Sequence, residues 1–154
     1  MFERILVCLD GSKLAEQIIP YATEQALKFD SRVTLLQVMT IPSSVSAAAG
    51  AAAQTGDIMK EESQREEADT RAYLDSVGQS LLKKGVNTDC VVLQPSPPGE
   101  AIVEYARDNS IDLICIATHG RSGLGRAVFG SVADHILRES GLPILLVRPK
   151  EAST

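Results

Sequence analysis

Apolar residues form five short runs along the chain, and polar or turn residues bound each run. The runs are RILVCL at 4–9, RVTLLQV at 32–38, TDCVVL at 88–93, DLICIA at 112–117 and PILLV at 143–147. Short apolar runs bounded by turn residues are typical of buried strands. The pattern therefore predicts five strands.

The four segments between these runs carry apolar residues three or four positions apart, which is the spacing of one helix face. The predicted helices cover 13–29, 57–84, 99–109 and 130–140. Their predicted inner faces hold Tyr73, Val77 and Leu81, then Ile102, Val103 and Ala106, and finally Val132, Ile136 and Leu137. Ser12 is the predicted N-cap of the first helix. Pro20 lies inside that helix and lacks a backbone N–H, so we expect a kink or two helical pieces.

The alternation of strands and helices predicts an α/β fold. We expect a single doubly wound, five-stranded parallel sheet with helices on both faces. Right-handed crossovers limit its strand order to a few possibilities. One domain is expected over 1–149, followed by a short tail over 150–154. The Ala- and Ser-rich stretch 40–56 is predicted to be a flexible insertion, either a functional flap or a disordered segment.

Charge and composition argue against several classes of protein. The 154 residues include 15 basic and 20 acidic ones, for a net charge of −5, and no Trp. An acidic chain with few aromatic residues argues against nucleic-acid binding. No apolar run approaches the roughly 18 residues of a membrane span, and the N-terminus lacks the long apolar region of a signal peptide. We expect a cytoplasmic protein in which Cys8, Cys90 and Cys115 are free thiols.

Residues that follow the predicted strands are the candidates for a ligand site, because doubly wound sheets bind ligands at the carboxyl ends of their strands. Asp10 and Gly11 follow the first strand, and Val38 ends the second. The fourth strand runs into the glycine-rich stretch ATHGRSGLGR at 117–126. These segments are therefore expected to meet at one edge of the sheet.

The glycine-rich stretch has the features of a phosphate cradle. Its three glycines let the backbone approach an anion closely, and Gly130 and Ser131 place a helix N-terminus beside them. Arg121 and Arg126 add positive charge. The stretch has neither the Gly-Lys-Ser/Thr of a P-loop nor the glycine spacing of a dinucleotide fingerprint. The alternative is a flexible loop in which Ser131 acts only as an N-cap.

With these residues the chain resembles the universal stress protein family, of the small UspA-like, ATP-binding type. The resemblance rests on Asp10-Gly11-Ser12 and on the block ATHGRSGLGRAVFGSVADHILRESGLPILLVRP at 117–149. The family's ATP pattern is Gly, two residues, Gly, nine residues and Gly-Ser/Thr. Gly120 and Gly130-Ser131 match it, whereas Ala117 stands at the first glycine. The resemblance implies a Rossmann-like fold of the adenine nucleotide alpha hydrolase type.

The resemblance also implies a ligand site. It assigns Asp10 to the adenosine end of ATP, the backbone of Val38 to the adenine edge, and the phosphates mostly to backbone N–H groups. The implied ATP-binding residues are Asp10, Gly11, Val38, Ala117, His119, Gly120, Arg121, Gly123, Gly130, Ser131 and Val132. Mg²⁺ or Mn²⁺ is expected to accompany the ATP, and no catalytic residue is assigned.

The same resemblance implies a homodimer, formed by antiparallel pairing of the last strand, from Pro143 to Val147. An exposed apolar edge strand needs covering on physical grounds as well. The expected function is that of a nucleotide-dependent regulatory module in the stress response, whose surface changes when ATP binds.

Three alternatives to this function stay open. A slow ATPase would need a general base, for which His119 and Asp10 are the only candidates. A nucleotide-free stress interaction protein would account for Ala117 in place of glycine. A cyclic AMP binder would use the same adenosine pocket as an ATP binder.

Overall fold

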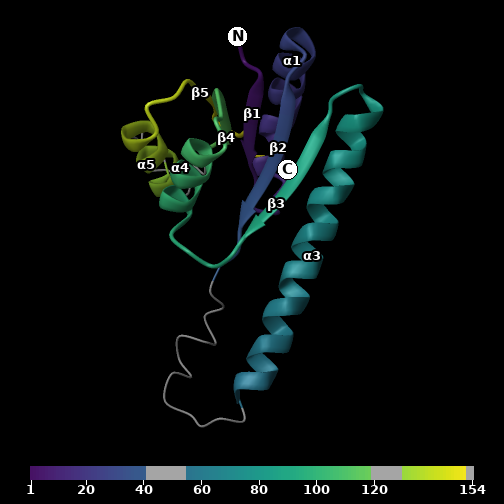
Figure 1. Cartoon of the computed structure of the whole chain (residues 1–154), viewed down its shortest axis with the longest axis vertical. Coiled ribbons are helices and arrows are strands. Elements are labelled where there is room, and N and C mark those ends of the chain that lie inside the picture. Colours follow the sequence, from purple (N-terminus) through teal and green to yellow (C-terminus); the bar gives the residue numbers. More distant parts are fainter. Residues whose placement is uncertain (41–54, 119–129, 152–154) are drawn as a thin grey trace.

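The computed structural model describes residues 1–40, 55–118 and 130–151, which form one sheet flanked by helices (Figure 1). The strands are β1 (Arg4–Cys8), β2 (Arg32–Val38), β3 (Thr88–Leu93), β4 (Leu113–Ala117) and β5 (Ile144–Val147). All pair in parallel, in the order β3-β2-β1-β4-β5. The five-stranded parallel α/β sheet predicted from the apolar runs is therefore confirmed.

Helices cover both faces of the sheet. They are a 3₁₀ helix η1 (Ala15–Ile18), α1 (Ile19–Phe29), α3 (Thr55–Lys83), α4 (Pro98–Asp108) and α5 (Ser131–Glu139). One buried cluster joins η1, α1 and α3 to one face, and a second joins α4 and α5 to the other. Figure 1 shows α1 and α3 on one side of the strands and α4 and α5 on the other.

The position of β1 at the centre of the sheet explains why its sequence is apolar without alternation. Its neighbours are β2 and β4, and both of its faces are covered. Ile5, Leu6 and Val7 are completely buried, with Leu6 in one cluster and the other two in the opposite one. A strand of a parallel sheet that is buried on both faces favours such a continuous apolar run.

The first predicted helix is indeed divided in two. The 3₁₀ helix η1 ends at Ile18, α1 begins at Ile19, and Pro20 lies in the first turn of α1. A proline fits there because the first N–H groups of a helix have no partner within it. The prediction of Ser12 as the N-cap is wrong, because η1 begins at Ala15 and its N-cap is Leu14. Ser12 Oγ still accepts a hydrogen bond from the Ala15 N–H at 3.1 Å.

The predicted inner faces of the helices are confirmed with one exception. Leu137 was expected to face the sheet, but its exposed fraction is 44 %, whereas Ala133 and Ile136 are buried. Val132, Ala133 and Ile136 share one stripe of α5 that packs on the sheet. Leu137 lies about 100° beyond Ile136 around the helix, at the margin of that stripe.

The helix α3 is far longer than the strands it covers. Its 29 residues span about 43 Å, and its first half extends past the carboxyl ends of the strands (Figure 1). Leu74 and Leu81 are buried against the sheet, whereas Ile58 in the extending half is exposed. The predicted insertion 40–56 lies mostly outside the described residues.

The cysteines are free thiols, as expected. Cys8 packs in the cluster beneath α4 and α5, and Cys115 packs in the cluster on the opposite face. Burial raises the pKa of both thiols, that of Cys115 to about 12. Within the described residues, no helix is long and apolar enough to cross a membrane.

Candidate functional site

A cavity of about 300 Å³ opens at the carboxyl edge of the sheet. It lies where β1 and β4 end, and these two strands are neighbours. The chain leaves β1 toward β2 and β3 on one side and returns to β4 and β5 on the other. This reversal is the topological switch point, where doubly wound sheets bind their ligands.

The cavity walls come from strand ends and from the starts of helices. The described residues that line it are Cys8, Leu9, Asp10, Ala15, Leu36, Val38, Thr40, Pro98, Ile102, Ile116, Ala117, Thr118, Gly130, Ser131, Val132 and Ala133. Most of these side chains are apolar. Among the described lining residues, Asp10 is the single carboxylate, and there is no Lys or Arg.

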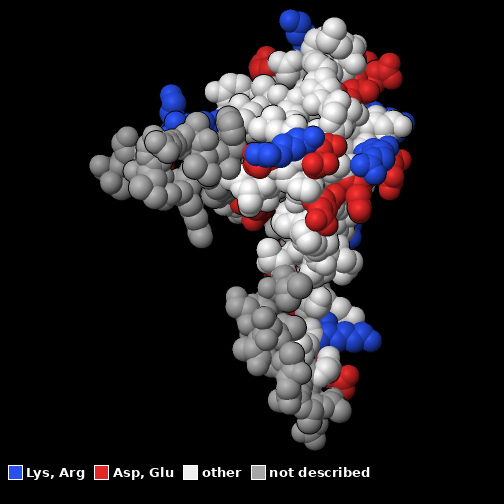
Figure 2. Space-filling view, turned by 90° about the vertical axis from the view of Figure 1, so that its left-hand side faces the viewer, with Lys and Arg blue, Asp and Glu red and all other residues white. Residues whose placement is uncertain are grey.

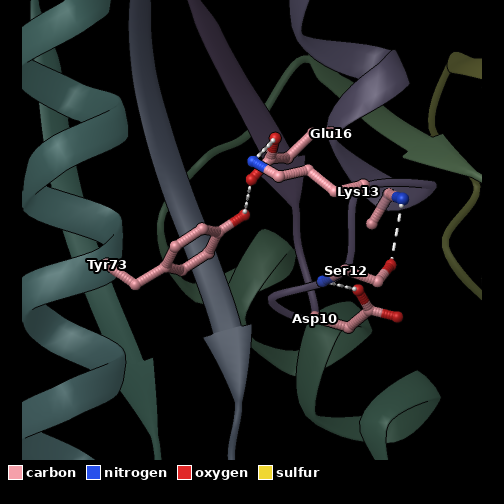
Figure 3. A network of polar contacts seen from close by, with 6 residues as sticks. Asp10, Ser12, Lys13, Glu16 and Tyr73 are labelled. Carbon is pink, nitrogen blue, oxygen red and sulfur yellow. Dashed lines mark hydrogen bonds and ion pairs between the residues drawn. The ribbon is translucent and has the colours of Figure 1, made fainter.

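Asp10 lies in a turn that its own side chain stabilises (Figure 3). Its Oδ1 accepts a hydrogen bond from the Ser12 N–H at 2.9 Å. Gly11 between them has φ +83°, a conformation that side chains rarely adopt. Gly11 is not among the lining residues, and a Cβ on it would lie 3.8 Å from the Gln37 side chain on the other face of β2. Gly11 thus shapes the turn that carries Asp10.

Two helices begin at the cavity. Gly130 caps α5, and the first hydrogen bond within that helix runs from the Asp134 N–H to the Gly130 carbonyl at 3.0 Å. The N–H groups of Ser131, Val132 and Ala133 therefore have no acceptor within the helix. They lie at the positive end of the helix dipole, where anions bind favourably.

The second helix start belongs to α4. Pro98 is its first residue, and the first hydrogen bond runs from the Ala101 N–H to the Pro97 carbonyl at 3.1 Å. The N–H groups of Gly99 and Glu100 thus lack an acceptor within the helix. Two helix N-termini thus lie at the cavity, whose described lining also includes the Asp10 carboxylate.

The two helix starts are held together by the contact between Gly99 and His135. A Cβ on Gly99 would lie 2.8 Å from the Cβ and 2.9 Å from the Cγ of His135 in α5. Only a residue without a side chain fits at that separation. This contact lets α4 and α5 pack closely beside the cavity.

The structure brings together more than half of the residues predicted for the site. Those that line the cavity are Asp10, Val38, Ala117, Gly130, Ser131 and Val132. Gly11 lies in the adjoining turn. His119, Gly120, Arg121 and Gly123 lie outside the described residues.

Several lining residues were missed by the sequence analysis. Pro98 opens the helix after β3, and the rule that ligands lie beyond the strand ends could have found it. Leu36 and Ile102 form part of the apolar cavity wall. Both belong to the buried cluster beneath α4 and α5, and that shared face could have indicated them. Thr118 is buried, and its N–H donates to the Val147 carbonyl at 2.8 Å.

A protein-held metal site is not formed by the described residues. Within them, no three His, Cys, Asp or Glu side chains come together in an arrangement that could hold a metal ion. With one carboxylate among the described lining residues, Mg²⁺ or Mn²⁺ would need phosphate oxygens and waters as its other ligands.

Comparison of the sequence with models of protein families identifies the family of this chain. Residues 1–148 match the model of the universal stress protein family. The chain belongs to the universal stress protein family. Universal stress protein MJ0531 of Methanocaldococcus jannaschii is 29 % identical over 153 residues, covering 98 % of this chain and 85 % of that protein.

Solved structures of universal stress proteins share this fold. Protein MJ0577 of Methanocaldococcus jannaschii has a TM-score of 0.80 at 22 % identity, covering 99 % of both chains. A universal stress protein in complex with cAMP has a TM-score of 0.63 at 17 % identity, covering 97 % of this chain and 98 % of that one. One from Archaeoglobus fulgidus in complex with dAMP has a TM-score of 0.61 at 17 % identity, covering 96 % and 98 %.

Proposed function

We propose that this universal stress protein binds ATP in the cavity at the carboxyl edge and acts as a nucleotide-dependent regulatory module. The observation that carries the proposal is the convergence of two helix N-termini on a cavity whose described lining is mostly apolar and includes one carboxylate. An adenine nucleotide has the matching parts, since it joins an apolar base to a ribose with hydroxyl donors and to an anionic phosphate chain.

The base and ribose are assigned to the apolar half of the cavity. Val38, Leu36 and Ile102 offer an apolar surface against which the adenine ring would pack. Asp10 is a carboxylate, and therefore an acceptor for the ribose hydroxyls. Asp10 follows the central strand β1 and lines the cavity.

The phosphates are assigned to the start of α5. The N–H groups of Ser131, Val132 and Ala133 supply three donors, and the helix dipole adds favourable electrostatics. Gly120 and Arg121 complete the phosphate site in this proposal. Any Mg²⁺ or Mn²⁺ would enter with the phosphates, because the described residues do not supply a metal site of their own.

The proposal includes a homodimer that pairs through β5. This strand lies at the edge of the sheet, and its four residues ILLV are only half-buried. An apolar edge strand of this kind favours pairing with a second chain. Light scattering should then give twice the chain mass of 16.5 kDa. A mass of one chain would contradict this part of the proposal.

Cyclic AMP or AMP is the second candidate ligand. The solved complexes with cAMP and dAMP show that other universal stress proteins take one-phosphate adenine nucleotides. Calorimetric titration with ATP, AMP and cyclic AMP separates the candidates. ATP should bind at least tenfold more tightly if its outer phosphates contact the protein, because each charged hydrogen bond adds about 1.5–3 kcal/mol.

The decisive experiment replaces Gly130. Its φ of −52° and ψ of 155° are open to any residue, and Asp and Ser are both good N-caps. Gly130→Asp should fold normally yet lose about a hundredfold or more in ATP affinity, because its carboxylate would face the phosphates. Gly130→Ser is the matched control and should keep affinity within a few fold.

One outcome of this experiment would contradict the proposal. Equal ATP affinity in both Gly130 variants would overturn the assignment of the phosphates to α5. A second outcome would overturn the whole proposal. If the purified protein contained no adenine nucleotide and bound none at millimolar concentration, the nucleotide-free interaction protein would replace it.

A further inference from the structure

The long helix α3 contributes no described residue to the cavity wall, yet one of its side chains contacts the segment that forms that wall. The Tyr73 hydroxyl donates a hydrogen bond to Glu16 Oε1 at 3.0 Å (Figure 3). Glu16 belongs to the 3₁₀ helix η1, directly after Ala15, which lines the cavity. The two residues are 57 positions apart in the sequence.

Tyr73 is the more fixed of the two partners of Glu16. Lys13 Nζ contacts the other carboxylate oxygen at 3.0 Å, but its side chain is 91 % exposed. Ion pairs of such exposed side chains contribute little, because solvent screens them and the side chain stays mobile. Tyr73, by contrast, packs on the buried cluster beneath α3.

Hydrogen bonds make residues 10–16 one continuous unit. The Ser12 N–H donates to Asp10 Oδ1, and Ser12 Oγ accepts from the Ala15 N–H. The Glu16 N–H donates to the Ser12 carbonyl at 3.2 Å. Asp10 at one end of this unit and Ala15 near the other both line the cavity. A shift of Glu16 would therefore move both of these wall residues.

The proton of the Tyr73 hydroxyl stays in place at neutral pH. Burial raises the pKa of Tyr73, and the carboxylates of Glu16 and Asp10 raise it further. The hydroxyl is therefore the donor, and a carboxylate oxygen is the acceptor. Hydrogen bonds to a charged group are stronger than those between neutral groups.

We infer that Tyr73 and Glu16 are positioning residues for the ligand site. Their hydrogen bond holds the unit 10–16 so that Asp10 and Ala15 keep their places in the cavity wall. Through this contact α3 sets ligand affinity without touching the ligand. The inference rests on the proposed function for the identity of the ligand, which is an adenine nucleotide.

Tyr73→Phe is the sharpest test, because it removes one hydroxyl and keeps the ring. In the free protein, hydrogen exchange at the Ser12 and Ala15 amides should become about tenfold faster, since the unit opens more often. Affinity for ATP should fall about three- to tenfold. Tyr105→Phe is the matched control, because the Tyr105 hydroxyl has no hydrogen-bond partner among the described residues, and it should change neither quantity.

Variants of Glu16 complete the test. Glu16→Gln keeps an acceptor for the Tyr73 hydroxyl but loses the charge of that hydrogen bond and the pairing with Lys13, so exchange should rise less than in Tyr73→Phe. Glu16→Ala should match Tyr73→Phe. The double variant Glu16→Ala with Tyr73→Phe should be no worse than either single one, because both remove the same contact.

The outcomes separate this inference from the proposed function. Unchanged exchange at Ser12 and Ala15 in Tyr73→Phe would overturn the positioning role, whatever the ligand. Faster exchange with unchanged ATP affinity would overturn the effect on the site. A wild-type chain that binds no adenine nucleotide would overturn the proposed function and the ligand part of this inference, whereas the exchange rates would still decide whether Tyr73 holds the unit.

Discussion

The sheet has a cavity at each end of its α4 face, and the two differ in chemistry more than in size. The cavity at the carboxyl edge measures about 300 Å³, and that at the amino edge about 280 Å³. The second is lined by Arg4, Arg32, Thr34, Asp89, Tyr105, Asn109 and Ile111. The helix α4 connects them, since it begins at the first cavity and ends at the second.

At the amino edge the charged groups are partnered by the protein itself. Arg32 Nη2 donates to Asp89 Oδ1 at 2.7 Å, and Arg32 Nε contacts the other carboxylate oxygen. Arg4 Nη1 donates to the Asn109 carbonyl at 3.1 Å and so satisfies the end of α4. At the carboxyl edge, the first N–H groups of α4 and α5 have no acceptor within their own helices. The comparison teaches that free hydrogen-bonding groups within its helix starts, and not volume, distinguish the proposed ligand site from the second cavity.

Charged side chains of both signs are mixed on one face of the molecule (Figure 2). Figure 2 shows one face of the molecule, on which the described Lys and Arg side chains alternate with Asp and Glu. They do not gather into a continuous basic area on the described part of that face. At the first cavity, the backbone groups of two helix starts add positive electrostatic character.

The largest effect is expected from Gly99→Ala, which disturbs the start of α4 beside the first cavity. The new Cβ would overlap His135 at 2.8 Å, and overpacking of this kind costs about 1–3 kcal/mol in unfolding free energy. Urea unfolding measures the loss. His135→Gly removes the overlapping Cβ, so Gly99→Ala should cost much less in that background than in the wild-type chain.

Gly56→Ala is the control for this substitution. A Cβ on Gly56 in α3 would meet nothing within 4 Å, so alanine should be neutral or stabilising by up to about 1 kcal/mol. Equal stability of the Gly99 and Gly56 variants would show that α4 and α5 do not need this close contact.

A smaller effect is expected from Asp10→Asn, which changes the charge of the first cavity and keeps its shape. The amide still offers an oxygen to the Ser12 N–H, so the fold should be kept. The affinity for ATP should fall about five- to tenfold, because a neutral acceptor binds the ribose hydroxyls less strongly. Calorimetric titration measures this, and unchanged affinity would remove Asp10 from the ligand site.

The smallest effect is expected from Asp89→Asn at the second cavity. The hydrogen bond from Arg32 holds the pKa of Asp89 below its usual value. A carboxyl with a lowered pKa stabilises the folded chain above its unfolded pKa of about 4, and this contribution is lost as the pH falls through the folded pKa. The variant should therefore be slightly less stable at pH 7, with a difference that shrinks toward pH 3.

Stability measured by urea unfolding at both pH values checks this, and ATP affinity should not change. If Asp89→Asn altered ATP affinity, the two cavities could not be treated as separate, and the comparison between them would fail.

Much of the fold could be predicted because each strand is a short apolar run with polar neighbours. The strands 32–38 and 88–93 match their predicted bounds, and Pro20 marked the division between η1 and α1. Leu137 was wrongly predicted to face the sheet, because it is apolar and next to Ile136 in the sequence. Its angle around α5 places it outside the buried stripe. Helix period alone does not say how wide the buried stripe is.

The site was predictable where it follows a strand and unpredictable where it depends on packing. Asp10, Val38 and Ala117 come at strand ends, so topology alone brings them together. The contact of Gly99 with His135 depends on the distance between two helices, which no local pattern specifies. The hydrogen bond between Tyr73 and Glu16 joins α3 to the 3₁₀ helix η1, and no local pattern predicts a contact between residues 57 positions apart.

The burial of the cysteines has a consequence for redox chemistry. The reactive form of cysteine toward peroxides is the thiolate. Burial, with Asp75 as a hydrogen-bonded neighbour, raises the pKa of Cys90 to about 11, so at pH 7 about one molecule in ten thousand carries that thiolate. Cys8 and Cys115 ionise even less readily. The raised pKa values therefore predict that peroxides oxidise these three cysteines slowly.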